Sequence, residues 1–332
     1  MTGSGSANRG CAAQAVGAGR LTAAPQGVLP VFCVVVSYNS GACLPGCLGA
    51  LLAQEPPPSR IMVVDNASSD DSATAVEREF PQVEVVRNRR NVGYGAAANQ
   101  GIEAAMEEGI PYVLVLNPDV VLEPGAAAAM VRALEETPTA AVAGPRILEA
   151  GRNTAPGSPE GVRGPAAGAP RLVPWLSGCA LLLRTAALRQ VGGFWPGFFL
   201  YGEETDLHYR LRTAGWQLVQ VPAAGAHHLG AASSREFVGG ARVCYYQIRN
   251  AFVLAKRTQW RHGVRATVGT VRWQLQWIVT LRRLLHPTRL AAILLGLVVG
   301  TYLFVRVKAL EVPTVLEESG HGARGIGPRL IP

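Results

Sequence analysis

The chain has 332 residues, 48% of them hydrophobic and 16% charged, so it is long enough to bury one large core or two modest ones. Its formal net charge of +8 favours an anionic partner, such as a phosphorylated substrate or an acidic membrane surface. Because no block of Arg and Lys is interleaved with aromatic residues, we do not expect nucleic acid to be a partner.

Short apolar strands are expected to alternate with helices along the first half of the chain. Residues 1–28 are rich in Gly, Ala and Ser and lack a continuous apolar core, which predicts a disordered tail. Beyond this tail, strands are predicted at 31–36, 60–64, 83–87, 111–116 and 139–142, and helices at 44–53, 71–80, 95–108 and 124–136. The alternation predicts an α/β fold in which a mostly parallel sheet carries helices on both faces.

Polar turns follow three of the first four predicted strands. They carry Ser37 and Asn39, then Asp65 and Asn66, and then Asn117 and Asp119. Ligands bind beyond the carboxyl ends of parallel strands, so we expect these side chains to share one rim of the sheet. A lone Asp suits Mg²⁺, which takes one or two carboxylates plus substrate phosphates. Taken singly, each Asp could also serve only as a turn residue or a helix cap.

An irregular segment separates this region from the rest of the chain. Residues 150–172 contain Gly, Pro and Arg without periodicity, and we expect them to form a mobile loop. A strand is predicted at 174–183, with Trp175 and Gly178 near its start, and a short helix is predicted at 184–191.

An aromatic run then leads directly into three acids at the start of a predicted helix. The acids are Glu203, Glu204 and Asp206. The helix macrodipole favours acids at this end, so a well-capped surface helix is one interpretation. Carboxylates behind Phe and Tyr side chains would lose hydration at a cost in free energy, which suits a general base or a ligand site instead. Asp206 is expected to pair with Arg210 one turn later and to be mainly structural.

The C-terminal part of the chain is basic and apolar. Within residues 261–310, Trp and Leu recur at helical spacing among Arg residues, and the apolar stretch from Leu290 to Val305 contains two glycines. This stretch is shorter than the roughly 20 residues that cross a bilayer, so we expect amphipathic and apolar helices that lie at the membrane surface. A transmembrane hairpin and a soluble core helix are the alternatives. Residues 311–332 are expected to form a flexible tail.

Five motifs occur in the order found in family 2 glycosyltransferases. They are VVVSYN at 34–39, VVDNASSD at 63–70, NVGYGAAAN at 91–99, LNPD at 116–119 and YGEETDL at 201–207. Together they resemble the bacterial rhamnosyltransferase-like group of that family. The resemblance covers about residues 30–260 and implies a GT-A (Rossmann-like) domain at 29–260 that uses a nucleotide-activated sugar and inverts the anomeric centre.

The resemblance also implies roles for particular residues. Asp65 would contact the nucleoside base, Asn99 would lie by the nucleotide-sugar, and Asp119 would bind a divalent cation, Mg²⁺ or Mn²⁺. Glu204 would be the catalytic base, with Glu203 beside it. The other candidates are Ser37, Asn39, Asn66, Gly93 and Asn117 on the donor side, and Trp175, Gly178, Asp206, His227 and His228 on the acceptor side or elsewhere in the site. The two histidines resemble a family motif near the diphosphate, and the sequence does not choose between them.

The implied function is transfer of a deoxyhexose such as rhamnose, or of a hexose, in cell-wall or polysaccharide synthesis. The acceptor would be a cell-surface glycan or its polyprenyl-linked precursor, at the cytoplasmic face of the cell membrane. Two departures from the family pattern keep a second hypothesis open, because Asn117 replaces an acid of the metal motif and Glu204 stands where many relatives have Asp. The alternative is a non-catalytic homologue that binds a nucleotide-sugar or a glycan.

Overall fold

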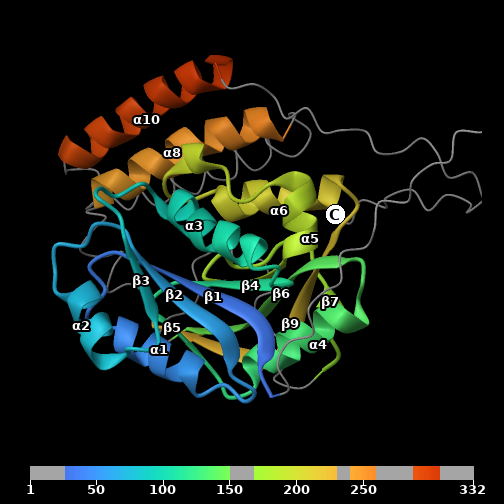
Figure 1. The fold of residues 1–332 in the computed structure, drawn as a ribbon. Helices are drawn as coiled ribbons and strands as arrows, with labels where there is room; N and C mark the ends of the chain where they lie inside the picture. The colour runs from blue at the N-terminus through green and yellow to red at the C-terminus, as the bar shows by residue number, and fades with distance from the viewer. Residues whose placement is uncertain (1–26, 150–167, 230–239, 259–286, 307–332) are drawn as a thin grey trace, which may run out of the picture.

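The computed structural model describes residues 27–149, 168–229, 240–258 and 287–306 (Figure 1). The terminal tails expected at 1–28 and 311–332 lie almost wholly outside the described residues, as do most of the loop expected at 150–172 and the Trp-rich part of 261–310. Residues 171–172 are described, and they form a short strand rather than loop.

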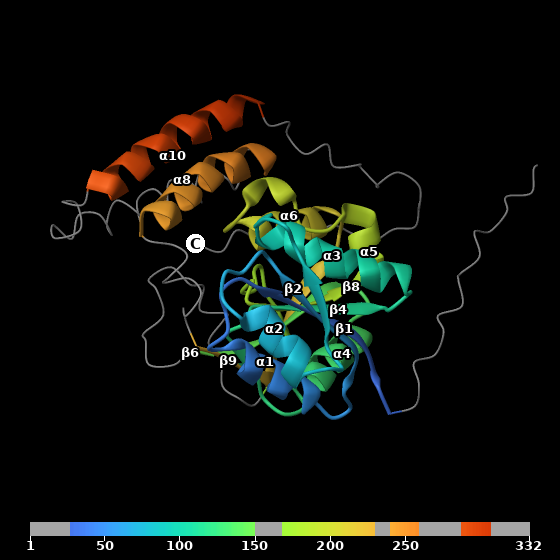
Figure 2. The ribbon, with the colours of Figure 1, turned by 60° about the vertical axis from the view of Figure 1, so that its left-hand side comes forward.

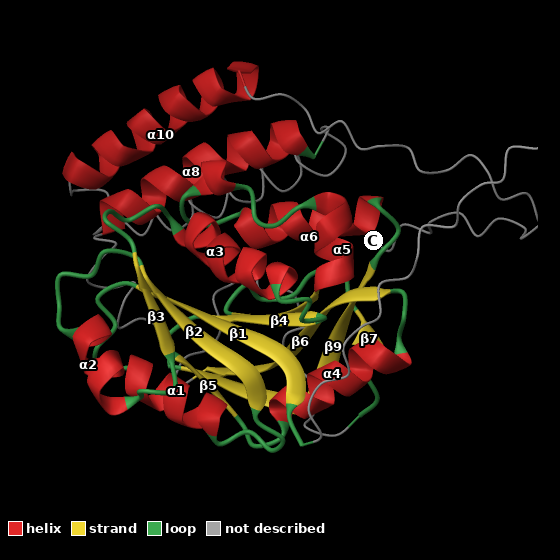
Figure 3. Cartoon of the chain, in the orientation of Figure 1, coloured by secondary structure: helices red, strands yellow, loops and turns green. Residues whose placement is uncertain are grey.

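Within the described residues, nine strands form one sheet in the order β3-β2-β1-β4-β8-β6-β9-β5, with β7 paired to β9 (Figure 3). The strands are β1 Leu29–Ser37, β2 Pro58–Asp65, β3 Glu84–Arg87, β4 Tyr112–Leu116, β5 Val120–Leu122, β6 Ala140–Glu149, β7 Arg171–Leu172, β8 Ala180–Arg184 and β9 Gln217–His228. Strands β1, β2, β3, β4, β6 and β9 share one direction, and β5, β7 and β8 run the opposite way. The expected mostly parallel α/β sheet is therefore confirmed.

Helices cover both faces of this sheet (Figures 1 and 2). The helices are α1 Leu44–Leu52, α2 Ser72–Glu79, α3 Tyr94–Glu107, α4 Ala126–Glu136, α5 Thr185–Val191, α6 Glu203–Thr213, α8 Gly240–Arg257 and α10 Pro287–Arg306. Helices α1, α2 and α4 pack on one face, whereas α3, α5 and α6 pack on the other. In β1, Cys33 and Val35 enter the first core while Phe32 and Val34 enter the second, which explains why this strand is a continuous apolar run.

Three strands are not predicted by the sequence. Strand β9 carries Pro222-Ala-Ala-Gly225 in its middle, which interrupts the β-branched pattern, and its pairing with β6 shifts register at the same place. Strands β5 and β7 have only three and two residues, too few for a recognisable alternation. The strand predicted at 174–183 begins only at Ala180, where it pairs antiparallel with β4.

The two C-terminal helices pack against each other above α3 and α6 (Figures 1 and 2). A Cβ atom at Gly296 of α10 would lie 3.1 Å from the backbone oxygen of Tyr245, and one at Gly300 would lie 2.8 Å from the ring of Phe252. The two glycines of the apolar stretch thus allow α10 to approach α8 closely. In the part of the chain that the structure describes, no helix combines the length and apolar content needed to cross a membrane.

Candidate active site

The loops after β1 and β2 form one side of the candidate site. Ser37 and Asp65 are paired in register at the ends of these strands, and both side chains are buried. Oδ1 of Asn39 accepts a hydrogen bond from the backbone N–H of Ser69 at 2.7 Å, and Oδ2 of Asp65 accepts one from that of Ser68 at 3.3 Å. These bonds hold the loop after β2 at the carboxyl edge of the sheet, where the donor-side residues are expected.

Asn66 holds the next loop rather than projecting from the rim. Its Nδ2 group donates to Oδ1 of Asn91 at 2.9 Å and to the carbonyl oxygen of Gly93 at 3.3 Å. Its Oδ1 accepts from Nδ2 of Asn88 at 3.2 Å and from the N–H of Val92 at 3.0 Å. An Asn side chain has two N–H donors and two acceptor positions, so this amide is fully used as a scaffold for the 88–93 loop.

The short antiparallel pair β5–β9 brings a histidine to Asp119. Val120 pairs with His228 in this ladder, and Nε2 of His228 lies 3.4 Å from Oδ1 of the buried Asp119. Side chains alternate along a strand, and Nε2 of His227 lies 3.3 Å from Oε1 of Glu123 instead. Of the two histidines that the sequence leaves undecided, His228 is therefore the one that lies beside Asp119.

The segment Gly178–Cys179 joins this corner of the site to the predicted catalytic helix. The carbonyl oxygen of Cys179 accepts the N–H of Asn117 at 2.9 Å, and that of Gly178 accepts the hydroxyl of Tyr94 at 3.3 Å. A Cβ atom at Gly178 would lie 3.2 Å from Cβ and Cγ of Glu204, so the carboxylate side chain packs directly on this glycine. Three parts of the chain therefore meet at Gly178 and Cys179. They are the turn that carries Asp119, the start of α3 and the start of α6.

Trp175 is linked to the Glu204 carboxylate through the hydroxyl group of Thr205. Its Nε1–H donates to Oγ1 of Thr205 at 3.4 Å, and the Thr205 hydroxyl donates to Oε1 of Glu204 at 3.3 Å. Trp175, which the sequence places on the acceptor side, thereby helps to orient the predicted base. Thr205 and Tyr94 carry no functional signal of their own in the sequence, although both lie inside motifs.

The two glutamates at the start of α6 differ in exposure, because Glu203 is buried and Glu204 is only partly buried. Burial, and then the charge of Glu204, raises the pKa of Glu203 to about 8. Burial also raises the pKa of Glu204, while backbone N–H groups and the Thr205 hydroxyl act in the opposite direction. Within the described residues, Oε2 of Glu203 has no hydrogen-bond partner. The arrangement favours a proton on Glu203 and the negative charge on Glu204 at neutral pH.

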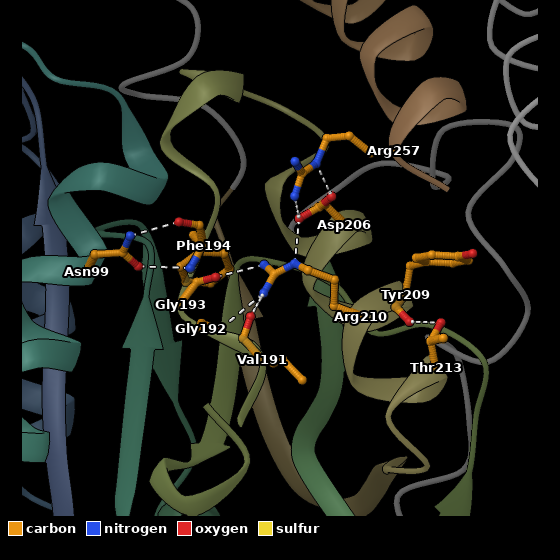
Figure 4. A network of polar contacts seen from close by, with 10 residues as sticks. All are labelled: Asn99, Val191, Gly192, Gly193, Phe194, Asp206, Tyr209, Arg210, Thr213 and Arg257. Carbon is orange, nitrogen blue, oxygen red and sulfur yellow. Dashed lines mark hydrogen bonds and ion pairs between the residues drawn. The ribbon is translucent and has the colours of Figure 1, made fainter. Parts of the chain in front are cut away.

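Asp206 has a different environment on the same helix (Figure 4). Its carboxylate is fully buried and pairs with Nε of Arg210 at 2.8 Å and with Nε of Arg257 at 2.5 Å. The expected pair with Arg210 is confirmed, and the second partner comes from α8. Asp206 therefore ties α6 to α8 and does not face the site as an acid.

The same network fixes the turn that precedes the aromatic run (Figure 4). The guanidinium of Arg210 donates to the carbonyl oxygens of residues 191–193 at 2.6 to 3.1 Å. Asn99 donates to the carbonyl oxygen of Phe194 and accepts its N–H, both at 2.8 Å. Asn99, which the resemblance puts by the nucleotide-sugar, is thus engaged with the protein backbone.

A divalent cation would find only part of its coordination shell here. The described residues hold no group of three or more His, Cys, Asp or Glu side chains arranged for a metal ion. Asp119 and His228 provide one carboxylate and one imidazole within 3.4 Å of each other. Two such donors fit a divalent cation that completes its shell with substrate phosphates.

Comparisons of sequence agree with this geometry. Residues 32–201 match glycosyl transferase family 2. An N-acetylglucosaminyl-diphospho-decaprenol L-rhamnosyltransferase of Mycobacterium tuberculosis is 32% identical over 288 residues, which cover 77% of this chain and 91% of the relative. The rhamnosyltransferase WbbL of Escherichia coli is 39% identical over 66 residues, which cover 20% of this chain and 25% of that protein.

Solved structures share the fold at low sequence identity. The mannosyltransferase PcManGT from Pyrobaculum calidifontis, in complex with GDP-Man and Mn²⁺, aligns with a TM-score of 0.53 at 15% identity, covering 83% of this chain and 87% of its own. Residues 1–349 of Staphylococcus aureus TarS, in complex with UDP-GlcNAc, align with a TM-score of 0.56 at 15% identity, covering 79% of each chain. The chain therefore belongs to glycosyl transferase family 2 and is a glycosyltransferase with the GT-A fold.

Proposed function

We propose that this enzyme transfers L-rhamnose, or another deoxyhexose or a hexose, from a nucleoside-diphosphate donor to a glycan on a polyprenyl diphosphate, with inversion. The observation that carries the proposal is the similarity to a mycobacterial L-rhamnosyltransferase over 91% of that protein, whose name gives N-acetylglucosaminyl-diphospho-decaprenol as acceptor. The meeting of Asp119, Tyr94 and Glu204 around Gly178–Cys179 supports it, because donor and acceptor groups must come together at one point.

Glu204 acts as the general base in this proposal. An acceptor hydroxyl attacks the anomeric carbon on the face opposite the leaving diphosphate, and the Glu204 carboxylate takes the hydroxyl proton. Its raised pKa brings its basicity closer to neutral pH, and the N–H groups at the start of α6 keep a useful fraction ionised. Glu203 retains its proton and so leaves the single negative charge of the pair on Glu204.

The donor occupies the rim built from the loops after β1, β2 and β4. Asp65 binds the nucleoside, with Ser37 and Asn39 beside it, and Asp119 with His228 holds a divalent cation such as Mn²⁺ or Mg²⁺. When bound, the cation offsets the charge that grows on the departing diphosphate. Mn²⁺ in the complex of the Pyrobaculum mannosyltransferase, which has the same fold, supports this assignment.

The outer face of α10 suits contact with a membrane that carries the acceptor. Its large exposed apolar side chains are Leu294, Leu295, Val298, Tyr302 and Val305. They lie on the side of the helix away from Gly296 and Gly300, which face α8. An apolar stripe of this kind lies at headgroup depth in peripheral proteins, here at the cytoplasmic face.

The test is transfer of sugar by the purified full-length protein. L-Rhamnose activated with uridine, thymidine or guanosine diphosphate is incubated with N-acetylglucosaminyl-diphospho-decaprenol and Mn²⁺, and release of nucleoside diphosphate is measured with and without acceptor. Acceptor-dependent release supports the proposal, and no turnover with any donor, including hexose donors, refutes it.

A matched pair of variants separates the enzyme from a non-catalytic homologue. Glu204→Gln should lower kcat by about 10²–10⁴-fold with little change in donor affinity, because it removes the proton acceptor alone. Glu136→Gln makes the same exchange on an exposed position of α4 and should leave the rate unchanged. Wild-type binding of donor without turnover would instead favour the binding protein.

A further inference from the structure

The segment that enters the catalytic helix is held in an unfavourable backbone conformation. Phe199 and Tyr201 have φ angles of +65° and +68°, in the left-handed region that non-glycine residues rarely adopt. Gly202, the next residue, has φ of +96°, and α6 begins at Glu203. A backbone of this kind persists only where its surroundings hold it in place. The position of Glu203 and Glu204 therefore depends on whatever holds residues 197–202.

Asn250 of α8 contacts this segment at more carbonyl groups than any other side chain among the described residues. Its Nδ2 group is directed at three carbonyl oxygens of the segment, those of Phe198 at 3.1 Å, Leu200 at 2.7 Å and Tyr201 at 2.7 Å. The side chain is only 3% exposed, so water does not compete for these bonds. One amide group thus fixes the carbonyls on both sides of Phe199 and up to the residue before Gly202.

Arg249 extends the same hold toward the start of the segment. Its guanidinium donates to the carbonyl oxygens of Gly197 at 2.7 Å and Phe198 at 3.1 Å, and to Oδ1 of Asn250 at 2.8 Å. The bond to Asn250 orients that amide with its N–H groups toward the segment. The ring of Phe199 in addition stacks on Tyr246 of α8, with centroids 5.0 Å apart and planes 17° apart.

The other end of α8 is attached to the catalytic helix itself. Arg257 pairs with Asp206, which lies in the first turn of α6 (Figure 4). Helix α8 therefore contacts the backbone before the two glutamates and a side chain just after them. The segment 240–258 also lies outside residues 32–201, over which the chain matches its family.

We propose that Asn250, oriented by Arg249, is a positioning residue that sets the place of Glu203 and Glu204 for the transfer reaction. This inference rests on the proposed role of Glu204 as base. It assigns a positioning role to Arg249 and Asn250, which are not among the site residues expected from the sequence.

Near-isosteric Asn250→Asp tests the inference in the full-length protein. The exchange removes the N–H donors and turns a carboxylate toward the three carbonyl oxygens, while it keeps an acceptor for Arg249. Thr258→Val serves as the control, because it removes a buried hydrogen bond of the same helix region, to the carbonyl oxygen of Leu254 at 2.8 Å, that does not reach the segment. Both variants are assayed with the nucleoside-diphosphate L-rhamnose that the wild type uses, and with N-acetylglucosaminyl-diphospho-decaprenol.

The expected result is a split between kcat and KM. Asn250→Asp should lower kcat by about 100-fold, the effect of misplacing a reacting group by about 1 Å, with donor KM within about threefold of wild type. Arg249→Lys, which keeps one donor, should lie closer to wild type than Arg249→Ala. Thr258→Val should keep the wild-type kcat. A wild-type kcat in Asn250→Asp would overturn the inference.

Hydrogen exchange separates failure of this inference from failure of the proposed function. In Asn250→Asp the amides of residues 197–206 should exchange faster while those of α8 remain protected, and in Thr258→Val residues 197–206 should exchange as in wild type. If the wild type transfers no sugar, the proposed function fails, and exchange alone decides the inference. Unchanged exchange at 197–206 in Asn250→Asp then overturns it.

Discussion

Asp206→Asn should destabilise the protein strongly, because it leaves two buried guanidinium groups without their counter-charge. The side chain of Asp206 is 0% exposed, and those of Arg210 and Arg257 are 8% and 9% exposed. Breaking a buried ion pair by removing one partner costs about 3–5 kcal/mol. Solvent screens this triad little, so we expect the full effect rather than the discounted value of a surface pair.

The assay is thermal and urea unfolding of the full-length protein at neutral pH. A loss of about 3–5 kcal/mol should lower Tm by about 6–20 °C, at roughly 2–4 °C per kcal/mol for a domain of this size. Glu84→Gln is the matched control, because Glu84 pairs with Arg60 at 2.6 Å while their side chains are 42% and 43% exposed. Such a surface pair contributes about 0–1 kcal/mol, so this variant should unfold close to wild type.

The result that would refute the reasoning is an Asp206→Asn variant that unfolds within about 1 kcal/mol of wild type, no further than a surface pair would allow. The attachment of α6 to α8 would then depend on packing alone. An equally large loss in Glu84→Gln would also contradict it, since burial would no longer distinguish the two pairs.

Three further predictions follow from the site. The pKa of Glu203 is raised from 4.5 to about 8, so between these pH values the folded state keeps a proton that the unfolded chain releases. Wild-type stability should therefore fall as pH rises from 4.5 to 8, by up to about 1.4 kcal/mol per unit of pKa difference. Glu203→Gln should lose this slope in urea unfolding at pH 5 to 9, and equal slopes would contradict the assignment. Gly178→Ala should lower kcat by about 10–100-fold at nearly unchanged Tm, because the new Cβ lies 3.2 Å from Glu204, whereas a wild-type rate would show that the carboxylate has room to move. His228→Ala should weaken binding of the nucleoside diphosphate that the wild type releases, measured with Mn²⁺ in calorimetry, by about 10–100-fold, while His227→Ala has little effect. The reverse order would reassign the histidine.

The central parallel strands could be predicted from sequence because their burial is two-sided. Residues of β1 alternate between two cores, so nearly every position must be apolar, and the run ends where Ser37 reaches the rim. Strand β9 could not be predicted in this way. Its pairing with β5 and β6 is long-range, and the Pro and small residues in its middle have no strand signal of their own.

The residues of the candidate site likewise fall into those that the sequence could predict and those that depend on long-range contacts. Positions at the ends of the parallel strands, such as Asp65 and Asp119, follow from topology, since carboxyl ends of parallel strands meet at one edge. That His228 rather than His227 lies beside Asp119 depends on the register of β5 against β9, which no local pattern contains. The hydrogen bonds of Asn99 with the backbone of Phe194 likewise could not be predicted, because they join α3 to a turn about 95 residues later in the chain.

The boundary of the family match has a practical consequence for building hybrid enzymes. The match ends at residue 201, two residues before Glu203, while the contacts that support this junction come from 240–258. Recombination between relatives at the end of this match would therefore separate residues 197–201 from the α8 side chains that hold their carbonyl groups. A crossover placed after residue 258 would keep this segment, the two glutamates and α8 in one parental piece and exchange only the later part of the chain.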